Sequence, residues 1–225
     1  PAVAFFALMR FKRSFTDPVP HQREESYRGL GIEMHHGEAR FIDPATLSVG
    51  GRRLEANRIV LATGARPASL EVVGEEHLIT SAEFLDLDRI PPRVAFIGGG
   101  YIAFEFAHIV ARAGAAPVIL QRGPRVLAGF DAGLVDELVE VSRAVGIDVR
   151  VDCAVRAVEK RADGFVVTGS VRGAEFGVAC DLVVHAAGRV ADLDDLDLET
   201  GNVERTDKGV AVNEFLQSRS NAAVY

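Results

Sequence analysis

Residues 94–107 read VAFIGGGYIAFEFA, an apolar run that ends in a glycine turn and continues as a helical pattern. This order predicts the start of a dinucleotide-binding βαβ unit. Gly98 allows the tight turn, Gly100 lets a pyrophosphate approach the backbone, and Ala103 is small enough for the helix to pack closely on the sheet. The helix would then direct its free N–H groups and its positive dipole end at the phosphates.

The segments around this turn alternate between strand and helix. We predict strands at 93–97, 117–121 and 147–151, with helices at 100–113 and 131–145 between them. A βαβαβ order implies a parallel sheet with right-handed crossovers. Three alternating segments then predict an antiparallel meander at 154–160, 164–171 and 174–180, and a further strand follows at 182–187. The fold class is therefore α/β, with a Rossmann-like βαβαβ parallel sheet and an antiparallel β-meander.

The flanking sequence is different in character. Residues 2–15 predict a helix with Ala4, Leu8 and Phe11 on one apolar face, which Phe15 extends. Residues 57–63 contain an apolar run at 59–62, and we expect a buried parallel strand there. The prolines at 91 and 92 mark a boundary. We expect three segments, at 1–91, 92–195 and 196–225.

Composition narrows the class of protein. The chain has 225 residues and a net charge of −7, which argues against nucleic acid or a membrane surface as a partner. Cys153 and Cys180 form no Cys-x-x-Cys pair, and their apolar surroundings predict buried, unreactive thiols. The six histidines form no spaced set, so we interpret them as structural or solvated and expect no metal site. A reducing cytoplasm fits this cysteine usage.

In a dinucleotide-binding unit, residues near the end of the second strand select between NAD and NADP. A site for NAD usually places an acid there, where it binds the ribose 2′-hydroxyl. This chain instead has Gln121 and Arg122, followed by Arg125. Two cations suit a 2′-phosphate, which favours NADPH over NADH. The alternative is that both arginines are solvated loop residues.

Further residues near the glycine turn are candidates for the site. Tyr101 could cover a flat ligand or simply pack against its neighbours. Glu105 lies between two phenylalanines, so its carboxylate is expected to need a partner unless it only complements the helix dipole. In the later turn HAAGR, Gly188 permits close backbone approach and Arg189 could reach a phosphate or carboxylate. An earlier strand likewise ends in ATGARP, residues 62–67.

Together these motifs resemble the pyridine nucleotide–disulfide oxidoreductases, the flavoenzyme group of glutathione reductase, dihydrolipoamide dehydrogenase and mercuric reductase. The glutathione reductase branch is the most similar. The resemblance implies that Tyr101 shields a flavin until nicotinamide displaces it, that Glu105 lies at the nicotinamide–flavin junction, and that Arg122 binds the 2′-phosphate. It also implies FAD contacts at Ala39, Thr63 and Gly64. The nicotinamide nucleotide site would comprise Gly98, Gly100, Tyr101, Ala103, Glu105, Arg122, Arg125, Gly188 and Arg189.

The sequence departs from this group at several points. Ala128 stands where a second arginine is usual, so NAD stays open beside NADP, and Val190 stands where proline is common. The chain has no first FAD glycine turn, no Cys-x-x-x-x-Cys pair and no C-terminal dimerisation domain. We therefore expect the central portion of a larger enzyme, flanked by incomplete parts of an FAD-binding domain. It would contain no catalytic residue, retain no FAD and not turn over alone.

The resemblance implies a function for the parent protein. It would pass hydride from NAD(P)H to FAD and on to a disulfide, and it would form a homodimer through the missing C-terminal domain. Two alternatives remain open. One is a flavin-dependent NAD(P)H oxidase or reductase without a redox disulfide, and the other is a non-catalytic nucleotide-binding module.

Overall fold

The computed structural model describes residues 4–225, which form two compact units. Unit 1 contains residues 4–16 and 67–188, and unit 2 contains residues 17–66 and 189–225. Each unit has its own apolar core. Within residues 4–225, no helix combines the length and the apolar composition that crossing a bilayer requires.

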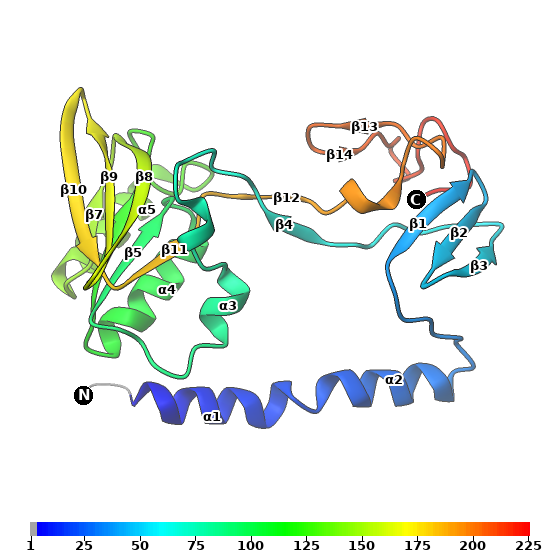
Figure 1. The fold of residues 1–225 in the computed structure, drawn as a ribbon, viewed down its shortest axis with the longest axis horizontal. Coiled ribbons are helices and arrows are strands. Elements are labelled where there is room, and N and C mark those ends of the chain that lie inside the picture. Colours follow the sequence, from blue (N-terminus) through cyan, green and yellow to red (C-terminus); the bar gives the residue numbers. More distant parts are fainter. Residues whose placement is uncertain (1–3) are drawn as a thin grey trace. The chain divides into compact units, whose positions relative to one another are not determined.

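A four-stranded parallel sheet forms the centre of unit 1 (Figure 1). Its order is β11-β5-β6-β7. The strands are β5 (Arg93–Ile97), β6 (Ala116–Leu120), β7 (Asp148–Arg150) and β11 (Leu182–His185). The crossover helices are α4 (Tyr101–Arg112) and α5 (Ala132–Ala144). The predicted βαβαβ order is confirmed, with ends that differ by one or two residues.

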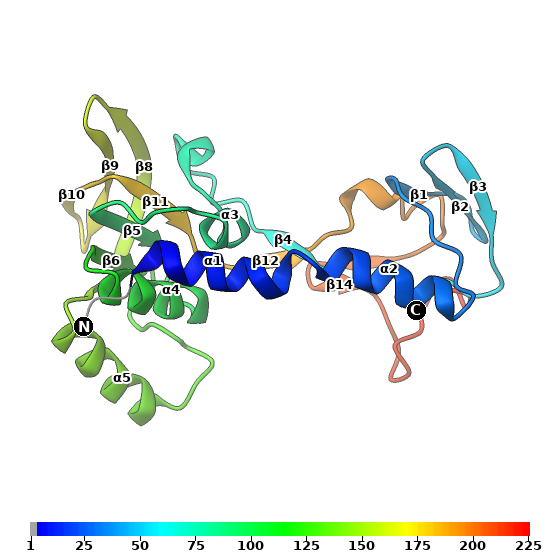
Figure 2. The same cartoon turned by 90° about the horizontal axis from the view of Figure 1, so that it is seen from below.

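Alternate residues of the parallel sheet face two different layers. Val94 and Phe96 pack with α4, whereas Ala95 and Ile97 pack with the antiparallel sheet. This period of two is what a strand buried on both faces requires. The antiparallel sheet, in the order β10-β9-β8, is the predicted meander, with strands β8 (Cys153–Arg161), β9 (Gly164–Val171) and β10 (Ala174–Cys180). Figure 2 shows the parallel sheet between this meander and the two helices.

The connector after residue 67 packs on unit 1. It contains η1 (Glu75–His77) and α3 (Ser81–Leu85). The amide of Ile79 donates to Val183 O, and the amide of His185 donates back to Ile79 O, so the connector lies along β11. We expected residues up to 91 to belong with the N-terminal segment. The compact units instead divide at 66/67 and 188/189, because these backbone bonds hold the connector to the sheet.

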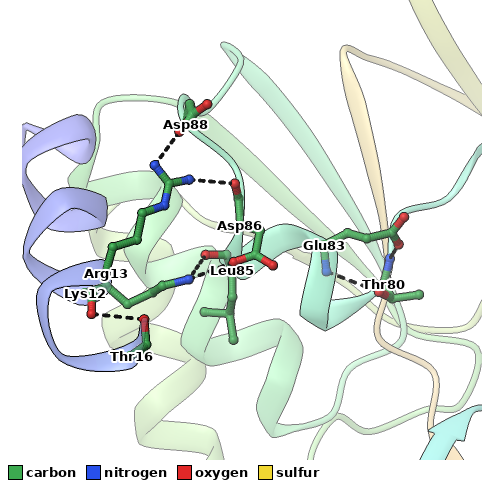
Figure 3. A network of polar contacts seen from close by, with 8 residues as sticks. All are labelled: Lys12, Arg13, Thr16, Thr80, Glu83, Leu85, Asp86 and Asp88. Carbon is green, nitrogen blue, oxygen red and sulfur yellow. Dashed lines mark hydrogen bonds and ion pairs between the residues drawn. The ribbon is translucent and has the colours of Figure 1, made fainter. Parts of the chain in front are cut away.

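Charged side chains attach helix α1 (Phe5–Thr16) to the end of α3 (Figure 3). Lys12 Nζ donates to Leu85 O at 2.9 Å and to an oxygen of Asp86 at 2.8 Å. Arg13 forms an ion pair of 2.7 Å with Asp88. Helix α3 begins at a capping box, in which Thr80 and Glu83 each accept from the other's backbone amide. The contacts of Lys12 and Arg13 therefore hold α1 at the C-terminal end of α3, whereas the capping box lies at the other end of that helix.

The buried face of α1 is not the one that the apolar pattern predicted. Residues 2 and 3 of the predicted helix lie outside the described residues. Phe5 and Met9 are buried, whereas Phe11 and Phe15 are 67% and 55% exposed and Leu8 is 37% exposed. Lys12 and Arg13 follow Met9 by three and four residues and so lie on the same side of the helix, and their ion pairs hold that side toward the end of α3.

Unit 2 is built around a small antiparallel sheet in the order β1-β2-β3. Phe41 is its most deeply buried large side chain, and it packs with Ile59, Leu196 and Val224. This part of the chain has one helix of 11 residues and several short strands. Its elements are α2 (Val19–Gly29), β1 (Ala39–Asp43), β2 (Thr46–Val49), β3 (Arg52–Glu55), β4 (Ala65–Pro67), β12 (Arg189–Ala191), η2 (Asp194–Leu196), β13 (Arg205–Thr206) and β14 (Gly209–Val210).

The prediction of a buried strand at 57–63 was wrong in most of its length. A single parallel bridge joins Ile59 to Val224, and its hydrogen bonds extend to the amide of Leu61. Ile59 is buried, but Val60 is 72% exposed. The side chain of Val60 points to a face that no described layer covers, so the apolar run does not become a central strand.

Candidate functional site

A cavity of about 620 Å³ opens in unit 1 where β5 meets α4. This volume lies within the range of small-molecule and cofactor sites. Its walls come from the glycine turn, the loop after β6, the start of β8, the connector and the turn after β11. The lining residues include Gly98, Gly99, Gly100, Tyr101, Gln121, Arg122, Ala128, Cys153, Ala187 and Gly188.

Each of the three glycines of the turn is required for a different structural reason. Gly98 has φ +108°, and a Cβ there would lie 2.3 Å from Ala186 O, so the turn packs on the segment after β11. At Gly99 a Cβ would lie 2.7 Å from the Val126 side chain. At Gly100 the nearest atom to such a Cβ is 3.8 Å away, which leaves the backbone open to a ligand. The roles predicted for Gly98 and Gly100 agree with this geometry, whereas the packing need at Gly99 was missed.

The N-terminus of α4 provides hydrogen-bond donors to the cavity. Gly100 is the N-cap residue and no side chain caps the helix. The first N–H groups of a helix lack partners within the helix, and the helix dipole places partial positive charge there. Ala103 is fully buried, so the helix lies close to the sheet as predicted. This combination of open glycine backbone and uncapped helix fits a diphosphate.

The loop after β6 supplies the charge of the cavity. Among the described residues that line the cavity, Arg122 carries the one charged side chain, and no carboxylate accompanies it. Arg122 is exposed and makes no hydrogen bond or ion pair with residues 4–225. Its guanidinium is therefore available to an anionic group of a ligand.

Arg122 and Arg125, which we predicted to bind the same 2′-phosphate, line two different hollows. Arg125 donates to Ala132 O at 3.2 Å and forms an ion pair of 3.2 Å with Asp136 on α5. It lines a second, smaller hollow of about 310 Å³ against α5. The predicted role of Arg125 in cofactor binding therefore lacks support from its position, and Arg122 carries the charge of the larger cavity alone.

Tyr101 and Glu105 take different positions on α4. Tyr101 is 56% exposed and lines the cavity, as a ring that covers a flat ligand must. Glu105 is exposed and lies outside the lining of the cavity, and it has no polar partner within the described part of the chain. The expectation that its carboxylate needs a partner was wrong, because the helix turns Phe104 and Phe106 inward and Glu105 outward.

The turn after β11 forms the opposite wall. His185 is buried, and its Nε2 lies 2.7 Å from Ala68 O, where it can only donate. This bond holds the connector beside β11, which confirms a structural role for this histidine. Gly188 has φ +113° and nothing within 4 Å of a built Cβ, so its backbone is open to the cavity. Arg189 instead donates to Ala65 O, outside the cavity lining.

The residues predicted to contact FAD all lie in unit 2. Ala39 is in β1 and packs against the core of that unit. Thr63 Oγ1 donates to Asp192 O at 2.6 Å. Gly64 has φ +77° and empty space where a Cβ would point, so its backbone can be approached closely. These features fit a backbone contact at Gly64, although the hydroxyl of Thr63 is already engaged.

The cysteines behave as the sequence predicted. Both are buried and free. Burial raises the pKa of Cys180 to about 11 and is also the largest cause of the raised pKa of Cys153. The thiolate form is therefore scarce at neutral pH. Within residues 4–225, no group of three or more His, Cys, Asp or Glu side chains is arranged to hold a metal ion.

Comparison with known proteins identifies the family of this chain. Residues 19–225 match the family Pyridine nucleotide-disulphide oxidoreductase, so the chain belongs to this family. It is 38% identical over 190 residues to a glutathione reductase from Burkholderia cepacia, covering 84% of this chain and 42% of that protein.

Other relatives agree with this assignment. The chain is 32% identical to a mercuric reductase from Staphylococcus aureus, covering 90% of this chain and 38% of the relative. It is 30% identical to a dihydrolipoyl dehydrogenase from Bacillus subtilis, covering 97% and 48%. The fold is similar to that of the HOCl-induced flavoprotein disulfide reductase RclA from Escherichia coli, with a TM-score of 0.89, 22% identity, and coverage of 99% of this chain and 52% of that one. The chain thus spans less than half the length of these curated relatives.

Proposed function

We propose that unit 1 binds the nicotinamide nucleotide of a flavin-dependent disulfide reductase, with NADPH preferred over NADH. The observation that carries this proposal is the cavity at the N-terminus of α4, where Arg122 is the one charged residue lining it within the described chain. Family membership supports the same chemistry, since the family description names a pyridine nucleotide and a disulfide. Held in this cavity, the nucleotide would supply the hydride that the full enzyme passes through FAD and on to a disulfide.

Each residue of the cavity would have a distinct task. The backbone N–H groups after Gly100 donate to the diphosphate, and the guanidinium of Arg122 pairs with the 2′-phosphate. The ring of Tyr101, which is 56% exposed and lines the cavity, would shield the flavin until the nicotinamide displaces it. The open backbone at Gly188 lets the flat ring approach the opposite wall. FAD would be approached by the backbone of Gly64 in unit 2.

Two further expectations belong to this proposal. Glu105 would act at the nicotinamide–flavin junction only if another part of the enzyme meets the exposed side of α4. The 225-residue chain by itself is expected to retain no FAD and to show no turnover. The absorbance spectrum of the purified chain checks this directly, since bound flavin colours the protein yellow.

Calorimetric titration with NADPH and NADH tests the nucleotide assignment. Arg122→Ala should weaken NADPH binding about 10- to 100-fold, because a hydrogen bond to a charged group contributes about 1.5–3 kcal/mol. Binding of NADH should change less than about threefold by the same reasoning, since it lacks the phosphate. Arg89→Ala is the matched control, because Arg89 is exposed and does not line the cavity. Tighter binding of NADH than NADPH, unaffected by Arg122→Ala, would overturn the assignment.

A further inference from the structure

Gly99, the middle glycine of the turn, is held through both of its polar backbone groups by the loop after β6. Its N–H donates to Gln121 Oε1 at 2.9 Å. Its carbonyl accepts from the amide of Leu127 at 2.9 Å. Residues 121–127 include Arg122, the cation that we expect to bind a phosphate. These two bonds therefore hold the loop of Arg122 in a fixed position relative to the glycine turn.

The packing at this junction is as close as the hydrogen bonding. A Cβ on Gly99 would lie 2.7 Å from Val126 Cγ1 and 3.0 Å from Gln121 Cβ. A substituted side chain at position 99 would therefore push the loop away from the turn. The absence of a side chain at Gly99 and the amide of Gln121 together set how far Arg122 lies from the N-terminus of α4.

The bond to Gly99 also fixes which way the Gln121 amide faces. An N–H can be met only by the carbonyl oxygen of the amide, so Oε1 faces the turn and Nε2 faces away. Nε2 lies on the side of Gly123, at 3.1 Å from where a Cβ there would stand. Nε2 makes no hydrogen bond to residues 4–225. Every buried polar side-chain atom in that range has a hydrogen-bond partner, so Nε2 is not buried and is accessible. Gln121 also lines the cavity.

This orientation has a consequence for ligand choice. Gln121 stands at the end of β6, where sites for NAD place a carboxylate that accepts hydrogen bonds from the ribose hydroxyls. A carboxylate offers acceptors only, whereas the amide of Gln121 uses its oxygen on Gly99 and leaves its two N–H donors free for a ligand. N–H donors can bind the oxygens of a phosphate, but they cannot accept hydrogen bonds from the hydroxyls of a ribose that carries no 2′-phosphate.

We propose that Gln121 is a positioning and specificity-determining residue, which locks the glycine turn to the Arg122 loop and presents donors to a 2′-phosphate. This inference rests on the proposed nucleotide function. The lock itself exists without any ligand, so one arm of its test is independent of that function.

Two substitutions separate the lock from the donor role. Gln121→Glu keeps an acceptor for the Gly99 N–H, removes the donors and adds a negative charge beside Arg122. Gln121→Met has similar length and removes both functions. Gln22→Glu is the charge-matched control, because Gln22 is exposed on α2 in unit 2. Each variant is made in the full 225-residue chain, and its thermal midpoint and circular dichroism verify folding.

The first arm measures amide hydrogen exchange of Gly99 by NMR without nucleotide. Exchange should quicken about tenfold in Gln121→Met, the effect of losing one hydrogen bond, and stay near wild type in Gln121→Glu. Unchanged exchange of Gly99 in a folded Gln121→Met protein would overturn the lock.

The second arm measures binding of NADPH and NADH. In Gln121→Glu, NADPH should bind at least about tenfold more weakly, while NADH binds within about twofold of wild type or more tightly. An NADPH-to-NADH affinity ratio that stays within about twofold of wild type would overturn the specificity role. If the wild-type chain bound neither nucleotide, the proposed function and the specificity role would both fall, and the exchange result would still decide the lock.

Discussion

Of the apolar runs that precede Gly98 and Gly64, only the first becomes a central strand. Val94–Ile97 precedes Gly98 and pairs with β11 on one side and β6 on the other. Ile59–Leu61 precedes Gly64 and pairs only through the bridge from Ile59 to Val224. The two runs look alike in sequence, so it is the layers around them that decide burial.

The contrast extends from the strands to the turns. The turn at Gly98 packs closely against the segment after β11, whereas a Cβ built on Gly64 would meet no atom within 4 Å. A turn held in this way presents the same backbone groups to every ligand, which is what binding a diphosphate requires. The close packing of Gly98 against Ala186 and Ala187, which also line the cavity, is therefore part of the candidate site.

The largest expected effect comes from truncating the strand cores. Phe96→Ala should destabilise unit 1 by about 3–5 kcal/mol, since Phe96 is fully buried and packs with Phe84. Val60→Ala is the counterpart in unit 2 and should change stability by less than about 0.5 kcal/mol, because Val60 is mostly exposed. Hydrogen exchange resolved by unit measures both. Equal losses in the two variants would contradict the contrast.

The glycine turns should differ by a smaller amount. Gly98→Ala places a Cβ 2.3 Å from Ala186 O at φ +108° and should cost at least about 3 kcal/mol. Gly64→Ala meets no atom within 4 Å, so only its left-handed backbone is penalised, by about 1–2 kcal/mol. Urea denaturation followed by circular dichroism gives both values. A Gly64→Ala protein less stable than Gly98→Ala would show that the packing at Gly98 is not what holds the turn.

The smallest expected effect is on the pH dependence of stability, and it arises between the two helices α4 and α5. His108 on α4 lies 3.0 Å from the hydroxyl of Ser142 on α5, and that hydroxyl donates to Leu138 O. Burial lowers the pKa of His108, and the positive charge of Arg112 lowers it further. The folded protein therefore favours the neutral ring, so this contribution to stability is complete above the unfolded pKa of about 6.5 and declines as the pH falls through it.

The variant His108→Gln checks this pH dependence. It keeps polar atoms near Ser142 but cannot take up a proton in this range. Denaturation of unit 1 at pH 7.5 and pH 5 should show a smaller loss of stability on acidification in the variant than in the wild-type chain. The same loss in both would mean that His108 is not the group responsible.

Structural features that follow from a local sequence pattern could be predicted, whereas features that depend on contacts between residues distant in the sequence could not. The βαβαβ order and the meander were predicted to within one or two residues, because buried strands and crossover helices carry strong periodic signals. The buried face of α1 was predicted wrongly, because the ion pairs of Lys12 and Arg13 join residues more than 70 positions apart. No local pattern contains such a contact.

The candidate site shows the same division. Gly98, Gly100 and Ala103 could be assigned from their spacing, since the turn itself determines their tasks. The separation of Arg122 from Arg125 could not be predicted, because Asp136 on α5 pairs with only one of them. The contact of Gln121 with Gly99 spans 22 residues and was also missed. A glutamine where an acid is usual was the one signal that could have drawn attention to it.

The central claim is that the cavity at the N-terminus of α4 receives the phosphates of NADPH. Titration of the isotopically labelled chain with NADPH, followed by amide NMR, tests this most directly. Our account predicts that the largest shifts fall on residues 98–103 and on Arg122, with residues 39–64 of unit 2 unchanged. Saturable binding that leaves 98–103 unperturbed, or no binding of NADPH at millimolar concentration, would contradict it.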